Sequence, residues 1–198
     1  MATKDLATQS DASSKERFVP RQFRVELWPW QKTVEASCDV LQEEDINVIY
    51  DPVGCTGKTT VEMLCRIHGK GIGARPTTNA KTLMCSLYVI LATKNLREPK
   101  AIFVEIPKFA TQKQMKAIFL AIRDAKHGRV YASRPVREWF FETPTVWVFC
   151  NKLPSFELSP TYKFWMIKDK ELHAFDFKPL SSTSPTSPTK CKRKLGSK

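Results

Sequence analysis

The chain has 198 residues, of which 42% are hydrophobic, so it is long enough for one domain with a substantial core. Its formal net charge of +12 favours a polyanionic partner, either nucleic acid or an anionic membrane surface. A membrane partner is disfavoured because no apolar run approaches the roughly 20 residues that span a bilayer, and residues 1–17 hold no signal-peptide core. We therefore expect a chain without membrane contact, on the cytosolic or nuclear side.

In chain order, the residue patterns alternate between helical and extended segments. They indicate a helix at residues 30–41, a strand at 47–50, a helix from about residue 57, a helix at 81–92, a strand at 101–106, a helix at 111–125, a hairpin at 129–141 and a strand at 146–150. Buried apolar strands separated by helices predict an α/β fold, with a central mostly parallel sheet flanked by helices.

The two ends of the chain have the composition of segments outside a folded domain. We expect residues 1–26 to be disordered, residues 27–172 to form the domain, and residues 173–198 to be a basic tail rich in Ser and Pro. The tail sequence KCKRK is a candidate nuclear-import signal or a loose polyphosphate contact, with a solvated tail as the alternative.

The six cysteines do not form a metal-binding pattern. No two have CxxC spacing, and the three histidines do not complete a zinc motif. Cys65 and Cys85 fall within apolar runs and Cys150 ends one, which is typical of small buried side chains. We expect reduced, structural thiols.

The segment between the first predicted strand and the next helix has the features of a phosphate-binding loop. It reads YDPVGCTGKTT, in which Gly54 and Gly57 permit a tight turn and a close backbone approach. Lys58 would reach the phosphates of a nucleoside triphosphate, Thr59 would offer its hydroxyl to Mg²⁺, and the helix N-terminus would add its dipole. The alternative is a GKT sequence in an ordinary loop. We expect ATP or another triphosphate to bind along Pro52, Val53, Gly54, Cys55, Thr56, Gly57, Lys58, Thr59 and Thr60.

Two later strand ends strengthen this prediction. Glu105 ends the apolar run AIFVE, where a P-loop enzyme keeps the acid that holds Mg²⁺ or polarises the attacking water. Asn151 follows VWVFC in the same way. Each residue alone is ordinary at a strand end. Their order after a phosphate loop favours an NTP hydrolase, with Thr59 and Glu105 as the Mg²⁺ ligands.

These segments together resemble a known helicase domain. WPWQ, DPVGCTGKTT, VEIPK and GRVYASRPVREWFFETPTVWVFCN are similar to the superfamily 3 helicase domain of replication-associated (Rep) proteins. Those proteins belong to eukaryotic circular single-stranded DNA (CRESS-DNA) viruses and related plasmids. The resemblance covers roughly residues 27–170 and implies a P-loop NTPase fold of the AAA+-like, superfamily 3 type. The family's loop often reads GPxGxxGK[ST], which matches Pro52 and places Asp51 where glycine is usual.

The resemblance also implies roles for individual residues. Lys58 and Thr59 would bind nucleotide and Mg²⁺, Glu105 would be the Walker B acid, and Asn151 would be the motif C asparagine that senses the γ-phosphate. Residues 128–138 match the B′ segment, whose basic residues face single-stranded DNA in the pore of a ring, with an exposed basic hairpin as the alternative. The candidate DNA contacts are Lys126, Arg129, Arg134 and Arg137.

The chain also departs from the family's pattern. Glu105 and Lys108 stand in for the Asp and Arg of a D-x-P-R setting. Lys163 is the cation nearest to the place where related proteins often carry an arginine that reaches the neighbouring subunit's nucleotide. Lysine lacks the planar fork of arginine, and an arginine finger contributes factors of about 10³–10⁵ in rate. We therefore expect slower hydrolysis than in relatives.

Three hypotheses of function follow from the residues and the resemblance. The first is an ATP-dependent DNA helicase or translocase that acts as a ring, expected to be a hexamer, in replication of a small circular DNA in the host nucleus or the cytoplasm. The second is a nucleotide-gated, oligomeric DNA-binding module or a regulator of a Rep protein. The third is an RNA helicase of the small-RNA-virus type. Rep proteins also carry a nicking domain with an HUH metal site, but this sequence contains no His-x-His, so an intact Rep protein is a candidate partner.

Overall fold

The computed structural model describes residues 18–40, 45–133 and 136–179. Most of the two end segments that we expected to be disordered or tail-like lies outside these residues, including the basic cluster KCKRK. Residues 18–28 do have a described structure, which includes the short 3-10 helix η1 (Arg21–Phe23).

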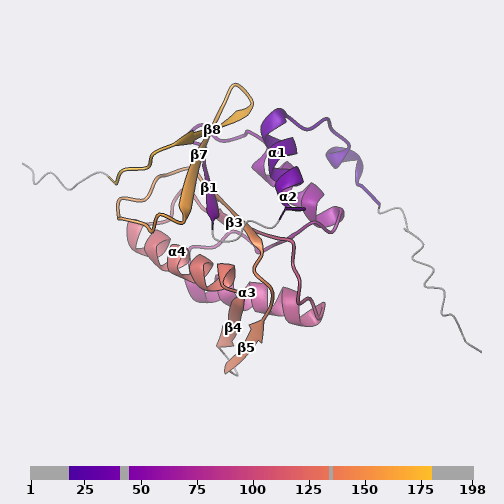
Figure 1. Cartoon of the computed structure of the whole chain (residues 1–198), viewed down its shortest axis with the longest axis vertical. Helices are drawn as coiled ribbons and strands as arrows, with labels where there is room; N and C mark the ends of the chain where they lie inside the picture. The colour runs from indigo at the N-terminus through magenta and orange to yellow at the C-terminus, as the bar shows by residue number, and fades with distance from the viewer. Residues whose placement is uncertain (1–17, 41–44, 134–135, 180–198) are drawn as a thin grey trace, which may run out of the picture.

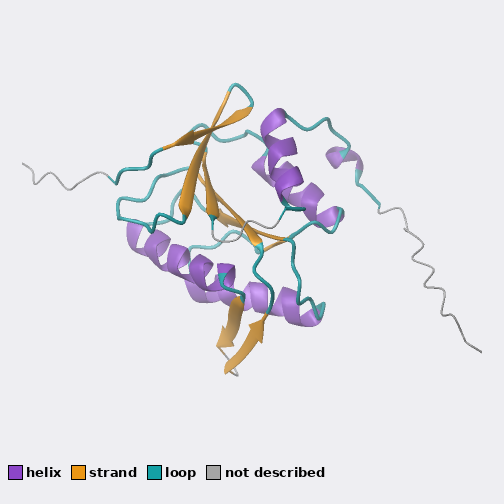
Figure 2. Cartoon of the chain, in the orientation of Figure 1, coloured by secondary structure: helices purple, strands orange, loops and turns teal. Residues whose placement is uncertain are grey.

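A six-stranded sheet forms the centre of the molecule (Figure 1, Figure 2). Its strands lie in the order β2-β3-β6-β1-β7-β8, and all neighbours are parallel except the antiparallel pair β7–β8. The bounds are β1 (Ile46–Tyr50), β2 (Ile72–Gly73), β3 (Ala101–Ile106), β6 (Thr145–Cys150), β7 (Tyr162–Lys168) and β8 (Glu171–Phe175). The prediction of an α/β fold with a mostly parallel central sheet is confirmed.

Helices cover both faces of this sheet. The helices α1 (Pro29–Ser37) and α2 (Lys58–Ile67) pack on one face, and α3 (Ala80–Thr93) and α4 (Gln112–Lys126) pack on the other (Figure 1). Alternate side chains of β1 point to opposite faces, so Val48 joins the core beneath α3 and α4 while Ile49 joins the core beneath α1 and α2. Burial on both faces explains the continuous apolar runs in the strand sequences.

Local sequence signals set where the longer helices begin. Thr111 accepts a hydrogen bond from the backbone N–H of Gln114, and the Gln114 side chain accepts one from the backbone N–H of Thr111, which is a capping box for α4. Asn79 caps α3 by accepting from two backbone N–H groups of the first turn. These caps satisfy donors that a helix start otherwise leaves without partners.

A separate two-stranded hairpin leaves the body of the domain beside α3 (Figure 1). Its strands β4 (Arg129–Ser133) and β5 (Val136–Phe140) pair in antiparallel fashion, from Arg129 opposite Phe140 to Ser133 opposite Val136. The predicted hairpin is therefore present, directly after α4 in the chain.

The structure extends beyond the predicted elements at the carboxyl end. We expected the domain to end at residue 172, but β8 continues to Phe175, and Phe177 stacks on Phe164 with ring centroids 4.4 Å apart. The expected tail therefore begins inside an element of the sheet. Within the described residues, no helix is both long and apolar enough to cross a bilayer.

Candidate functional site

The loop between β1 and α2 turns through left-handed backbone conformations. Gly54 has φ 81°, Cys55 has φ 58° and Gly57 has φ 85°. The backbone angle of Gly57 favours glycine, and a β-carbon there would lie 2.5 Å from Nε2 of Gln31, so a larger residue would also displace the Gln31 side chain. The two glycines that the sequence pattern singled out therefore shape the turn.

The first turn of α2 starts directly after this loop. Lys58 is the first residue of the helix, the first turn contains no acid, and Thr59 is exposed on it. The backbone N–H groups at a helix N-terminus and the positive end of the helix dipole favour an anion at this place. The arrangement is suited to phosphate oxygens.

Asp51 lies beneath the loop and accepts three of its hydrogen bonds. The carboxylate is only 2% exposed and accepts from Gly54 N at 2.9 Å, from Thr56 Oγ1 at 2.8 Å and from Lys58 Nζ. Burial acts to raise the pKa of Asp51, but the hydrogen bonds and the charge of Lys58 outweigh it and hold this pKa below its usual value. Asp51 and Lys58 thus form a buried ion pair.

The carboxyl ends of three parallel strands meet beside this loop. β6 lies between β1 and β3, and Cys150 is opposite both Tyr50 and Ile106. The residue after β6, Asn151, donates a hydrogen bond from Nδ2 to the backbone oxygen of Asp51. The register therefore brings the loop, the asparagine and the acid of β3 to one edge of the sheet.

A hollow of about 610 Å³ opens at this edge. Its walls include Lys58, Glu105 and Asn151, three of the four predicted catalytic residues, and nearly all of the predicted nucleotide-binding loop. The lining consists of Pro52, Val53, Gly54, Cys55, Thr56, Gly57, Lys58, Thr59, Glu105, Lys108 and Asn151. Residues from the β1–α2 loop, from β3 and from the end of β6 thus face one space.

The donor set of the hollow fits a magnesium-bound triphosphate. Within the described residues, no group of three or more His, Cys, Asp or Glu side chains could hold a metal ion alone. Mg²⁺ is commonly held by one or two protein oxygens together with phosphates and water, so the hydroxyl of Thr59 and the carboxylate of Glu105 are a suitable pair. Among the described residues, Glu105 is the single acid in the lining of the hollow.

Two further residues of this region carry no signature in the loop pattern. Gln31 on α1 is 4% exposed, donates to Gly57 O at 2.9 Å and accepts from Trp28 N at 2.9 Å. The sequence signal for Gln31 is its place two positions after Pro29, where a glutamine side chain can accept a hydrogen bond from the backbone N–H of the N-cap residue. Gln31 fixes the end of the phosphate loop from the neighbouring helix.

Glu62 is a second carboxylate near the site. It is 7% exposed, and a β-carbon on Gly73 would lie 2.2 Å from its Oε1. Burial raises the pKa of Glu62, the charge of Arg66 opposes this, and the charge of Glu105 adds to it. Glu62 is absent from the lining of the hollow, and its link to the site is the charge of Glu105.

The predicted DNA contacts have different environments. Lys126 is 3% exposed and donates to the backbone oxygen of Pro144 at 2.9 Å, so its ammonium is not presented at the surface as we expected. The reason is that α4 packs this side against the connection before β6, where the carbonyl offers a partner. Arg129 is exposed and paired with Glu138, and Arg137 is exposed, whereas Arg134 lies outside the described residues.

Lys163 does not contribute to the hollow of its own chain. It lies on β7, where it is half-exposed and its Nζ is 3.9 Å from Asp45 Oδ1. The lining of the hollow does not include it. An expected contact with the nucleotide of a neighbouring subunit is compatible with this exposure.

Contacts from the end of α3 hold the base of the hairpin. The guanidinium of Arg97 lies 3.5 Å from the centre of the Trp139 ring and donates to Phe140 O at 2.6 Å. In return, Trp139 Nε1 donates to Leu96 O at 3.0 Å. Gly128 has φ 75°, and a β-carbon there would lie 2.0 Å from Phe141 O. The hairpin is therefore fixed at its base.

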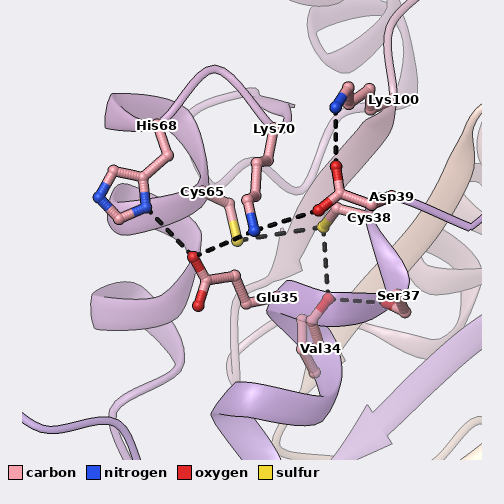
Figure 3. A network of polar contacts seen from close by, with 9 residues as sticks. All are labelled: Val34, Glu35, Ser37, Cys38, Asp39, Cys65, His68, Lys70 and Lys100. Carbon is pink, nitrogen blue, oxygen red and sulfur yellow. Dashed lines mark hydrogen bonds and ion pairs between the residues drawn. The ribbon is translucent and has the colours of Figure 1, made fainter. Parts of the chain in front are cut away.

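A polar network joins α1 to the far end of α2 (Figure 3). Lys70 bridges Glu35 and Asp39 with distances of 3.4 and 3.1 Å, and Lys100 Nζ lies 2.7 Å from Asp39. His68 Nδ1 is 3.1 Å from Glu35. Hydrogen bonds from Lys100 and Lys70 lower the pKa of Asp39. The network keeps α1 beside α2, which is what the contact of Gln31 with the loop requires.

The cysteines of the described residues are free thiols. Cys38 and Cys65 are buried between α1 and α2 with their sulfur atoms 4.0 Å apart (Figure 3). Cys150 is also buried. The hydrogen bond between the two thiols and then burial raise the pKa of Cys65. Cys85 is half-exposed and Cys55 is exposed in the phosphate loop. The buried thiols behave as parts of the core.

No protein-family model, curated protein or solved structure matches this chain. The class of site is therefore defined by its own geometry: a glycine-containing loop after a central parallel strand, a helix N-terminus, and an acid and an amide on the two neighbouring strand ends.

Proposed function

We propose that this protein is an ATP-dependent helicase or translocase that acts on single-stranded DNA, a P-loop NTPase of the superfamily 3 type. One observation carries the proposal: Lys58, Glu105 and Asn151, from three separate segments, line one hollow at the carboxyl edge of the sheet. Ligands of open α/β sheets bind outside this edge. A GKT sequence in an ordinary loop would give no reason for the acid and the asparagine to converge there.

The residues of the hollow divide the work of hydrolysis. The loop N–H groups and the start of α2 hold the phosphates, and Lys58 balances their charge. Thr59 and Glu105 would hold Mg²⁺, which supplies neutralisation of the phosphate charge. Glu105 would also orient the attacking water and take up its proton, and Asn151 would donate to an oxygen of the terminal phosphate.

The nucleic-acid contacts of the proposal rest on the hairpin and the surface beside it. Arg137 is exposed on β5, and Arg129 is exposed with Glu138 as its partner. Lys113, Lys116 and Arg123 are exposed along α4, which leads into the hairpin. Contacts of this kind bind phosphates without regard to sequence. Assembly as a ring would place hairpins of several subunits along one strand, with Lys163 reaching the nucleotide of a neighbour.

A second candidate function is a nucleotide-gated DNA-binding module, or a regulator of a Rep protein, with weak turnover. The specific observation that favours it is the buried ion pair of Lys58 with Asp51, which engages the lysine that a triphosphate needs. Import into a host nucleus belongs to both proposals and depends on the basic tail outside the described residues.

The test is an ATPase assay with and without single-stranded DNA, comparing wild-type protein, Lys58→Ala and, as a matched control, Lys32→Ala on the exposed side of α1. We expect DNA-stimulated turnover that Lys58→Ala abolishes and Lys32→Ala leaves intact. Binding that depends on Lys58 without turnover would select the second candidate. Turnover that survives Lys58→Ala would mean a contaminating enzyme and refute the helicase.

A parallel measurement addresses the nucleic acid. Binding of single-stranded DNA is expected to weaken steeply as salt rises, because phosphate contacts release counterions. An RNA oligonucleotide of the same length distinguishes DNA from RNA as the stimulating partner. A flat salt dependence would remove the electrostatic contact from the proposal.

A further inference from the structure

The phosphate loop already holds an anion of its own. The carboxylate of Asp51 accepts from Gly54 N, Thr56 Oγ1 and Lys58 Nζ, and it is 2% exposed. Loop N–H groups and the lysine are the same kinds of donor that cradle the phosphates in a P-loop. The loop is therefore organised around an internal carboxylate before any nucleotide binds.

The backbone holds this carboxylate in place from two sides. Asp51 N donates to Cys150 O at 2.9 Å, and Asn151 Nδ2 donates to Asp51 O. Both contacts tie Asp51 to β6, the strand that also positions the asparagine of the site. These contacts fix the backbone of Asp51 directly beneath the loop.

The ion pair changes the charge that the hollow offers to a polyphosphate. Lys58 is 7% exposed and engaged by Asp51, so its positive charge is compensated before nucleotide arrives. Lys108 lines the same hollow, is exposed and takes part in no ion pair among the described residues. An incoming phosphate must share or take over Lys58 while a negative carboxylate remains beneath the loop.

We infer that Asp51 is an affinity-determining residue of the nucleotide site, an internal carboxylate that competes with the phosphates for the donors of the loop. The inference rests on the proposed function, since it requires a triphosphate at this site. Its consequence is fast release: a protein with this pair binds nucleotide weakly and lets the product leave easily, because Asp51 takes back Lys58 as the phosphate departs.

The test compares wild-type protein with Asp51→Asn, which keeps the shape and an acceptor oxygen but removes the charge. Fluorescently labelled ADP is titrated in the presence of Mg²⁺, and the thermal unfolding of the nucleotide-free protein is measured beside it. We expect Asp51→Asn to bind at least about tenfold more tightly, which corresponds to about 1.4 kcal/mol. The nucleotide-free variant should unfold at a lower temperature, because Lys58 stays buried without its partner.

A rise in ADP affinity together with a fall in stability distinguishes a competing role of Asp51 from a purely structural one. If Asp51 only supported the loop, the variant would lose affinity and stability together, and that result would overturn the inference. Asp51→Gly, which removes the acceptor entirely, should also bind more tightly and serves if the asparagine variant folds poorly. Asp169→Asn, in the exposed turn between β7 and β8, is the matched control and should change neither quantity.

Two outcomes separate this inference from the function on which it rests. In the first, the wild-type protein binds labelled ADP, Lys58→Ala abolishes this binding, and both Asp51 variants bind equally well or more weakly. That result supports the nucleotide site and overturns the competing role of Asp51. Absence of labelled ADP binding in the wild-type protein and in both Asp51 variants overturns the nucleotide site and the competitor with it.

Discussion

Truncation of Arg97 should loosen the hairpin without unfolding the domain. In Arg97→Ala the ring of Trp139 loses the guanidinium that lies 3.5 Å from its centre, and Phe140 O loses a donor at 2.6 Å. An exposed cation–π contact contributes about 0.5–1 kcal/mol and a hydrogen bond from a charged group about 1.5–3 kcal/mol. Because Arg97 is exposed to solvent, we take roughly 2 kcal/mol for its two contacts together. This corresponds to about a thirtyfold change in the equilibrium between the docked and the opened hairpin.

Amide hydrogen exchange measures this opening directly. The amides of β4 and β5 should exchange about thirtyfold faster in Arg97→Ala, while those of β1, β3 and β6 keep their wild-type rates. Lys94→Ala, which removes an exposed cation at the C-cap of α3, serves as the control and should leave the hairpin unchanged. DNA-stimulated ATPase should fall in Arg97→Ala while basal ATPase persists. If the amides of β4 and β5 exchange at wild-type rates, or if the central strands accelerate equally, Arg97 does not hold the hairpin on the domain.

Three further changes test other contacts. Gly128→Ala should destabilise the domain by at least about 2 kcal/mol in urea unfolding, because its β-carbon would meet Phe141 O at 2.0 Å in a left-handed conformation; near-wild-type stability would contradict this geometry. Gln31→Ala should cost about 1–2 kcal/mol and weaken nucleotide binding, since Gly57 O loses its donor; calorimetric titration with intact affinity would remove Gln31 from the site. Glu62 has a folded-state pKa raised above 4.5, so it binds its proton more tightly when folded and costs stability as pH rises through that range. The stability of Glu62→Gln relative to wild type should therefore increase as pH rises above 4.5, and a gain that shrinks with rising pH would contradict the raised pKa.

Apolar patterning predicted the strands that build the site. Residues 101–106 form β3 with the expected bounds, and the strand expected at 146–150 is present as β6, which begins one residue earlier, at Thr145. These strands are buried on both faces, so their sequences are continuous apolar runs that stand out from their surroundings. The convergence of loop, acid and asparagine could be predicted because parallel strands present their carboxyl ends at one edge.

The remaining features depend on contacts between distant segments. β7 has mixed exposure and β2 is only two residues long, so neither has a clear periodic signal. Lys126 is buried because a carbonyl just before β6 accepts a hydrogen bond from its ammonium, which no local pattern indicates. The contact between Arg97 and Trp139 joins residues more than forty positions apart, so no local pattern indicates it either. We expected the first helix to run from residue 30 to residue 41, but α1 ends at Ser37 and Cys38 is its C-cap.

The candidate site is completed late in synthesis, because the strand in the middle of the site, β6, comes late in the chain. The hydrogen bond from Asn151 to Asp51 joins residues 100 positions apart, and β6 must insert between β1 and β3 before the hollow has all its walls. A nascent chain that stops before residue 145 would possess the glycine loop but no completed cradle. The hollow would then reach its full lining only after β6 and Asn151 have joined the sheet.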